Sequence, residues 1–148
     1  MAISSAICSS FKQELLQGKH SFESSGGHTF KIALYSDSAS LGTTTTAYTT
    51  SQEVSGSGYS AGGNTLTNTG VAKSTVTSYT DFSDTSWTSA SFTARGCLIY
   101  NSSSISGLTS NAAVFSIDFG GNKTVSSGTF TIQFPANNSS SAIIRITS

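Results

Sequence analysis

Side chains able to act in catalysis or to bind a metal are scarce in this sequence, and their spacing matches no known motif. His20 and His28 lie on either side of a polar turn, without Cys or His partners at the spacing of metal ligands, so we expect both at the surface. Asp81 and Asp84 lack the glycine and the closing glutamate of a calcium loop, which favours a turn with side-chain-to-backbone hydrogen bonds. The sequence therefore predicts a protein without enzymatic activity, cofactor or bound metal.

Two dense apolar runs supply the elements that would position the remaining charged residues. Residues 97–100 and 112–119 are short, rich in aliphatic or aromatic side chains and bounded by turn residues, as is typical of strands deep in a β-sandwich. Arg95 lies just before the first run and Asp118 within the second. If the runs pair, these two residues could form a buried ion pair, which would add structural specificity or offer a polar hook to a partner.

A helix is predicted over residues 4–17. Ile3, Ile7, Phe11 and Leu15 recur every fourth residue and so share one helical face. A helix this short is marginal alone, so the apolar stripe must dock on the chain's own sandwich or on a neighbouring subunit. The expected caps are Ser4 or Ser5 at the start and Gly18 in a left-handed conformation at the end.

Residues 36–63 form a long stretch rich in Gly, Ser and Thr, with few aliphatic side chains. A connection of this length in a compact domain is usually functional or ordered by a partner. It can be an arm across an adjacent copy, an excursion over its own sandwich, or disordered. Its large anchoring residues are Leu41, Tyr48, Val54 and Tyr59.

The rest of the chain predicts one domain over residues 1–148, with most of its strands in 64–148. Short β-prone runs alternate with turn signals, including a tight turn expected at 120–122. The fold class is therefore mainly β, an antiparallel β-sandwich or jelly-roll-like domain preceded by one N-terminal amphipathic α-helix. The expected strands are 28–35, 66–71, 75–82, 85–87, 90–95, 97–100, 112–119, 123–125, 130–134 and 142–146.

Composition excludes some classes of partner. Charged residues make up 9% of the 148 residues, and seven Lys and Arg balance seven Asp and Glu. Binding to nucleic acid or to an anionic membrane requires clustered cations, so neither partner is expected. Ser and Thr supply 53 residues, so hydroxyl groups dominate the polar surface. Such a surface suits a protein surrounded by copies of itself, and equally an ordinary β domain with Thr-rich exposed faces.

The two cysteines and the N-terminus bear on cellular location. Cys8 falls on the predicted helix and Cys97 in a core strand, which favours two buried free thiols over a disulfide. The N-terminus lacks the basic region and long apolar run of a signal peptide, and no stretch approaches the length of a membrane span. We therefore expect synthesis in a cytoplasm without export by the ordinary route.

Several segments, taken as a set that spans nearly the whole chain, resemble a family of small virion proteins of tailed bacteriophages. The resemblance implies a virion component and brings no catalytic residues with it. The segments that carry it are Ser10–Leu16, Thr29–Tyr35, Gly58–Gly63, Ala94–Asn101, Val114–Gly120, Phe130–Pro135 and Ala142–Ile146.

The resemblance leads to the expectation of a capsid decoration, or cement, protein on the outer surface of the virion. Trimers at local symmetry axes would bridge copies of the major capsid protein, and binding only to the assembled lattice would stabilise it. The 36–63 arm is one expected contact region. The individual residues expected to contact other subunits or the capsid are Ile3, Ile7, Phe11, Leu15, Tyr48 and Tyr59.

Two other functions fit the same sequence. The chain can be a tail- or fibre-associated module whose sandwich serves as a host-binding head. It can also be a carbohydrate-binding domain, because exposed aromatic rings make platforms for sugars. The residues that would supply such platforms are Trp87, Tyr48, Tyr59 and Tyr79.

Overall fold

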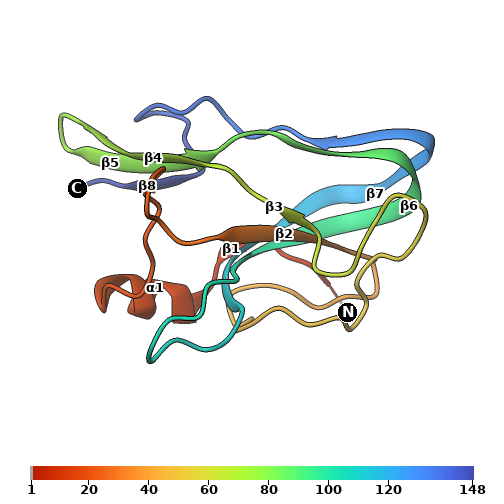
Figure 1. Cartoon of the computed structure of the whole chain (residues 1–148), viewed down its shortest axis with the longest axis horizontal. Coiled ribbons are helices and arrows are strands. Elements are labelled where there is room, and N and C mark those ends of the chain that lie inside the picture. Colours follow the sequence, from red (N-terminus) through yellow and green to blue (C-terminus); the bar gives the residue numbers. More distant parts are fainter. Residues whose placement is uncertain (1) are drawn as a thin grey trace.

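The computed structural model describes residues 2–148 and shows a mainly β, antiparallel architecture with a sandwich-like arrangement of two sheets and one short helix near the N-terminus (Figure 1). The fold class predicted from the sequence is thereby confirmed. The elements are β1 Ala6–Ile7, α1 Ser9–Leu16, β2 Phe30–Tyr35, β3 Asn64–Thr65, β4 Asn68–Ser74, β5 Thr77–Phe82, β6 Thr85–Asn101, β7 Ala112–Ile132 and β8 Ile144–Ile146.

The strands form a five-stranded sheet in the order β1-β7-β6-β2-β3 and a three-stranded sheet in the order β4-β5-β8. Every pair of neighbouring strands is antiparallel. In Figure 1 the three-stranded sheet lies in the upper layer, and α1 lies below it at the same end of the molecule. This end of the domain holds the site described below.

β6 and β7 are by far the longest strands, and their pair curls over at one end of the molecule so that it contributes to both layers (Figure 1). The β6–β7 ladder contains a large bulge. Ala94 pairs with Lys123, whereas Gly96 pairs with Asp118, so β7 has extra residues between these two pairs. The tight turn predicted at 120–122 is therefore wrong. β7 runs through this stretch, and Gly120, with φ of 78°, lies in the bulge.

The core lies between the layers and is rich in aromatic rings. Phe22 and Phe30 stack with ring centroids 4.4 Å apart, and Phe82 lies 5.7 Å from Phe30. The apolar runs predicted as deep strands do pair, with Leu98 of β6 opposite Ser116 of β7. Both residues are buried, which confirms that these runs organise the core.

The helix predicted over residues 4–17 starts later than expected. The backbone of the preceding residues bonds to strands instead: the Ser4 N–H donates to the Leu41 carbonyl over 2.9 Å, and the Cys8 N–H donates to Val114 over 3.0 Å. These bonds hold residues 4–8 extended, although their apolar spacing fits a helix. Neither predicted serine caps α1, and Cys8 takes the N-cap position without a side-chain bond.

The C-terminal end of α1 follows the prediction. Gly18 has φ of 70°, and the following Lys19 N–H bonds back to the Glu14 carbonyl over 2.9 Å. Leu15 packs against the core, whereas Leu16 is 91% exposed. Within residues 2–148, no helix has the length and apolar character needed to cross a membrane.

The long connection 36–63 lies over its own domain, which is one of the three alternatives open from the sequence. Its Val54 N–H donates to Leu34 of β2 over 2.9 Å, and the Ser91 N–H of β6 donates to Ser57 over 3.0 Å. It carries no long strand of its own, yet repeated backbone bonds fix its path.

Cys8 and Cys97 are both buried and free, as predicted. Burial raises the pKa of the Cys97 thiol to about 12. Burial, with a further contribution from the Glu14 carboxylate, raises the pKa of Cys8 to about 11. Both groups are therefore poor nucleophiles at neutral pH, because the reactive form is the thiolate.

Candidate functional site

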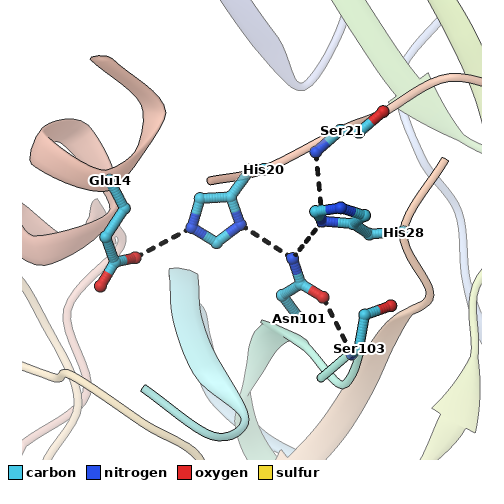
Figure 2. Close-up of polar contacts among 6 residues, drawn as sticks. All are labelled: Glu14, His20, Ser21, His28, Asn101 and Ser103. Atoms are coloured by element: carbon cyan, nitrogen blue, oxygen red, sulfur yellow. Dashed lines mark hydrogen bonds and ion pairs between the residues drawn. The ribbon is translucent and has the colours of Figure 1, made fainter. Parts of the chain in front are cut away.

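One group of polar and titratable side chains connects α1, the segment after it and the end of β6 (Figure 2). Nε2 of His20 lies 2.9 Å from Oε2 of Glu14. Nδ2 of Asn101 lies 3.0 Å from Nδ1 of His20 and 2.9 Å from Nδ1 of His28. The Ser103 N–H donates to Oδ1 of Asn101 over 3.0 Å. We call Glu14, His20, His28 and Asn101 the histidine network.

The hydrogen bonds determine the protonation of both rings. An amide nitrogen carries two hydrogens and accepts none, so Asn101 donates one to each Nδ1 atom. Each imidazole therefore carries its own hydrogen on Nε2, and in His20 this hydrogen is donated to Glu14. Nδ1 of His28 also accepts the Ser21 N–H over 3.3 Å. Both imidazoles are neutral in this arrangement.

The prediction that both histidines lie at the surface is wrong for His20. It is 8% exposed, and its ring centroid lies 4.8 Å from that of Phe11. His28 is half-buried. Burial, and secondarily the nearby charge of His20, lowers the pKa of His28 from its ordinary value. Their polar flanking sequence predicted exposure, but the segment turns back onto Asn101, which lies far away in the chain.

The chemistry open to the histidine network is limited by its bonding. A carboxylate beside an imidazole can move a proton, but the second nitrogen of the His20 ring is already bound by Asn101. Within residues 2–148, no three side chains of His, Cys, Asp or Glu type are grouped so as to hold a metal. The arrangement as it stands ties three segments together.

A second polar cluster surrounds Glu53 in the 36–63 connection. The Tyr59 hydroxyl donates to Oε1 of Glu53 over 2.6 Å, and the Tyr48 hydroxyl donates to Oε2 over 2.7 Å. The Gly62 N–H also donates to Oε1, over 2.8 Å, and the Tyr100 hydroxyl donates to the Gly62 carbonyl over 2.7 Å. We call these five residues the tyrosine cluster.

The tyrosine cluster holds its phenols in the neutral form. Burial is the largest cause in each case, and the Glu53 carboxylate adds to it, so the pKa values of Tyr48 and Tyr59 rise well above the ordinary range. The same two causes raise the pKa of Tyr100 to about 12. The Leu34 N–H donates to the Tyr59 hydroxyl over 2.9 Å, so this oxygen attaches residues 36–63 to β2.

The ion pair expected between Arg95 and Asp118 forms. Nε of Arg95 lies 2.7 Å from Oδ1 of Asp118, and Nη2 lies 3.3 Å from Oδ2. The expectation that it is buried is wrong, because the two side chains are 35% and 26% exposed. The bulge in the β6–β7 pair lies beside it, where the strands curl. An exposed pair of this kind contributes little to stability.

Asp81 and Asp84 accept backbone hydrogen bonds, as favoured from the sequence. The Asp81 carboxylate accepts from the Phe82 and Ile143 N–H groups, and Asp84 accepts from the Phe134 N–H over 2.7 Å. Burial raises the pKa of Asp81 against the lowering effect of its two N–H donors. Both carboxylates thus connect strand ends across the upper layer.

An apolar groove of about 250 Å³ opens between α1 and the three-stranded sheet, next to the histidine network. Part of its wall is formed by His20 and the three residues after it. The residues that supply its apolar surface are Leu15, Phe22, Val71, Tyr79, Ile144 and Ile146.

Large exposed apolar residues lie on several elements at the same end of the molecule as the groove. Val71 and Ile146 are 51% and 59% exposed at the groove, and Val76 is 67% exposed at the turn between β4 and β5. Leu16, at the end of α1, is the fourth large exposed hydrophobic residue of this end. Figure 1 shows α1, the β4–β5 hairpin and the C-terminus together at this end of the molecule. We call Leu16, Val71, Val76 and Ile146 the apolar end face.

The residues predicted to contact other subunits do not form one surface. Ile3 and Phe11 are 6% and 2% exposed, so the predicted contact role is wrong for them in the folded monomer. Leu15 is half-buried against the core, and Ile7 is 38% exposed on β1. They do not share a helical face because the chain is extended up to Cys8.

The aromatic residues predicted as contacts or sugar platforms are also used within the chain. Trp87 is 3% exposed, which is a correction to its proposed role as a platform. Tyr48 and Tyr59 pack on the core and donate their hydroxyls to Glu53. Of the four predicted platform residues, only Tyr79 lines an open site, the apolar groove.

Sequence reasoning missed Asn101, Glu53 and the apolar end face. Asn101 directly follows the apolar run 97–100, and a polar residue at that place was a usable signal for a buried hydrogen-bond partner. Glu53 is the one acidic residue after Asp37 within the 36–63 connection, which also was a signal. Nothing in the sequence marked Val76 or Ile146 as exposed rather than buried.

The comparisons with known proteins give no further guide to the site. No family model, curated protein or solved structure matches the chain.

Proposed function

We propose that this chain is a non-enzymatic structural protein of a tailed-phage virion, acting as a decoration protein on the outer capsid. The observation that carries the proposal is the apolar end face on a domain of zero formal net charge whose polar residues are mainly Ser and Thr. Exposed apolar patches on soluble domains mark interaction sites. The resemblance to small phage virion proteins points to the same class of function.

The proposed mechanism is mass action. A trimer of this chain that binds several copies of the major capsid protein, and binds them only in the assembled lattice, stabilises that lattice without any chemical step. The long connection 36–63 is bonded to its own domain, so we place the contact at the apolar end face instead. The histidine network and the tyrosine cluster serve to hold the scaffold.

The test is to locate and count the chain in particles of the phage that encodes it. Cryo-electron microscopy is expected to show density for this fold on the outer shell, and quantitative proteomics a copy number comparable with that of the major capsid protein. Density confined to the tail, with few copies, would support the tail-associated alternative. Particles without the chain would reject both.

The contact surface is tested by rebinding to particles that lack the chain. Ile146→Ser removes one of the apolar residues at the groove and is expected to weaken rebinding. Ile7→Ser is the control, because Ile7 is also exposed but does not line the apolar groove and borders a different pocket with Arg145 and Thr147. If only the Ile7 variant loses binding, the contact lies at the N-terminal segment as the sequence predicted.

A further inference from the structure

The histidine network connects parts of the chain that lie far apart in the sequence. Residues 19–28 form the latch segment, which leaves α1 and leads to β2. His20 and His28, near the two ends of this segment, both bond to Asn101 at the end of β6. Figure 2 shows these hydrogen bonds, which attach the segment to β6. His28 and Asn101 are 73 positions apart in the sequence.

We propose that the histidine network is a proton-sensitive latch, which ties the latch segment to β6 while His28 is neutral and opens when Nδ1 of His28 takes up a proton. The inference rests on bonding geometry and is independent of the proposed role in a virion.

A proton on Nδ1 of His28 has no acceptor in this site. Two N–H groups already point at that atom, one from Ser21 and one from Asn101. Once Nδ1 carries hydrogen, both donors lose their acceptor and face another donor. The ring must therefore move away from β6, or the amide must rotate.

Rotation of the Asn101 amide does not restore the bonding. It would turn Oδ1 toward the rings, but it would also turn the amide hydrogens toward the Ser103 N–H, which now donates to Oδ1. His20 would then face an oxygen with its unprotonated Nδ1. The same atoms thus satisfy the neutral state fully and the protonated state only in part.

Two carboxylates and one ammonium group lie around the network. Glu14 faces Nε2 of His20 from α1, and Glu23 shares a shallow surface pocket with His28. Nζ of Lys19, in the latch segment, donates to the carbonyl of Ser106 in the loop between β6 and β7. β2 and β6 contribute uncharged groups, the Phe30 ring and the Asn101 amide.

Burial and the charge of His20 lower the pKa of His28, which agrees with a site built for neutral rings. As the pH falls below the ordinary His value of 6.5, the folded state then binds fewer protons than the unfolded chain, so the latch is expected to stay closed above that pH and to open at a lower pH. Because the latch segment also forms a wall of the apolar groove, opening changes the shape of that groove.

The first test reads the two rings and the amides that they hold. Long-range ¹H–¹⁵N NMR at pH 8 is expected to show the Nε2–H tautomer for both histidines. Protection factors from amide exchange, corrected for intrinsic rates, are expected to fall at Ser21 and Ser103 between pH 8 and pH 5. The Val54 amide, bonded to Leu34, serves as the internal control. An Nδ1–H tautomer for His28, or unchanged protection at Ser21, would overturn the proposal.

Asn101→Asp is the sharpest variant, because it replaces the two donated hydrogens by an oxygen that accepts from protonated Nδ1 atoms. We expect the titration midpoint of His28 to rise by about one pH unit or more, and Ser21 to stay protected or gain protection at pH 5. Asn68→Asp is the matched control, because Nδ2 of Asn68 donates to the Glu23 and His28 carbonyls rather than to a ring. An equal rise in both variants would mean general electrostatics and not a latch.

His28→Asn keeps the test decisive if the Asn101 variant does not fold. The amide oxygen of the new side chain can accept near the former Nδ1 position, but it takes up no proton between pH 8 and pH 5. Protection at Ser21 is then expected to stay constant over that range. A loss of protection equal to that of the wild-type protein would overturn the role of His28 as the trigger.

Discussion

The histidine network and the tyrosine cluster solve the same structural problem with opposite chemistry. Each ties a long segment to the β2–β6 pair through buried polar groups. In the network a neutral amide donates to two imidazoles, whereas in the cluster a carboxylate accepts from two phenols and one N–H group. A segment without regular structure is thus held by the number of polar groups whose hydrogen bonds are satisfied. Whether these groups are acids or bases decides at which pH the attachment weakens.

The largest difference between the two regions should follow from removing the carboxylate at the centre of the tyrosine cluster. Glu53→Ala leaves three donors without an acceptor, and we expect the free energy of unfolding to fall by about 3 kcal/mol or more. Urea unfolding measures this change. Glu23→Ala is the control, because Glu23 is exposed and its loss should change stability by at most about 0.5 kcal/mol. Equal effects would show that the cluster does not hold the connection.

The Tyr59 hydroxyl gives the next largest effect. Tyr59→Phe keeps the ring but removes the oxygen that donates to Glu53 and accepts the Leu34 N–H, so we expect a loss of about 1–3 kcal/mol. Tyr79→Phe is the matched control, because its hydroxyl makes no hydrogen bond within residues 2–148 and lines the groove. A thermal-melt comparison in which both variants match the wild type would remove the cluster's role.

The dependence of stability on pH should separate the two regions. The lowered pKa of His28 means that stability is complete above about pH 6.5 and falls as the pH drops through that value. The pKa of Tyr100 is raised from 10.0 to about 12. Its contribution to stability is therefore fully present below pH 10 and is lost as the pH rises from 10 to about 12. In chemical unfolding from pH 5 to pH 11, His28→Asn should reduce the slope of the acid side only, and Tyr100→Phe should reduce that of the alkaline side only, to which the other buried phenols and the two thiols also contribute. Either variant changing both sides equally would contradict the separation.

The smallest effect is expected outside both regions. Arg95→Gln removes an ion pair whose two side chains are 35% and 26% exposed, so the loss of stability should be the smallest of these variants and should shrink further in high salt. Unfolding at low and high salt measures it. A larger loss would mean that the pair helps to hold the bulge where β6 and β7 curl over.

Local patterns in the sequence predicted the parts of the fold that depend on neighbours along the chain. Residues 97–100 and 112–115 are apolar and buried on both faces of their strands, and the runs that contain them do pair. Gly18 ends α1 as predicted because only the local backbone decides a left-handed cap. The helix start was wrong because residues 4–8 bond to Leu41 and Val114, far away in the chain.

The candidate site was less predictable for the same reason. His20 and His28 gave no signal of burial in their own polar surroundings, and Asn101 joins them only after β6 has paired with β2. Glu53 likewise gains its phenols from Tyr48, Tyr59 and the folding of the connection over β2.

The sequence by itself thus determined a charge-poor, hydroxyl-rich β domain with two free thiols and a core built on two apolar runs, because composition and residue periodicity are local properties. Tertiary structure alone decided which polar groups are buried, where the 36–63 connection lies and which apolar residues remain at the surface. The physical reason is that a hydrogen bond or a buried face needs a partner, and here the partners lie up to 113 positions away along the chain.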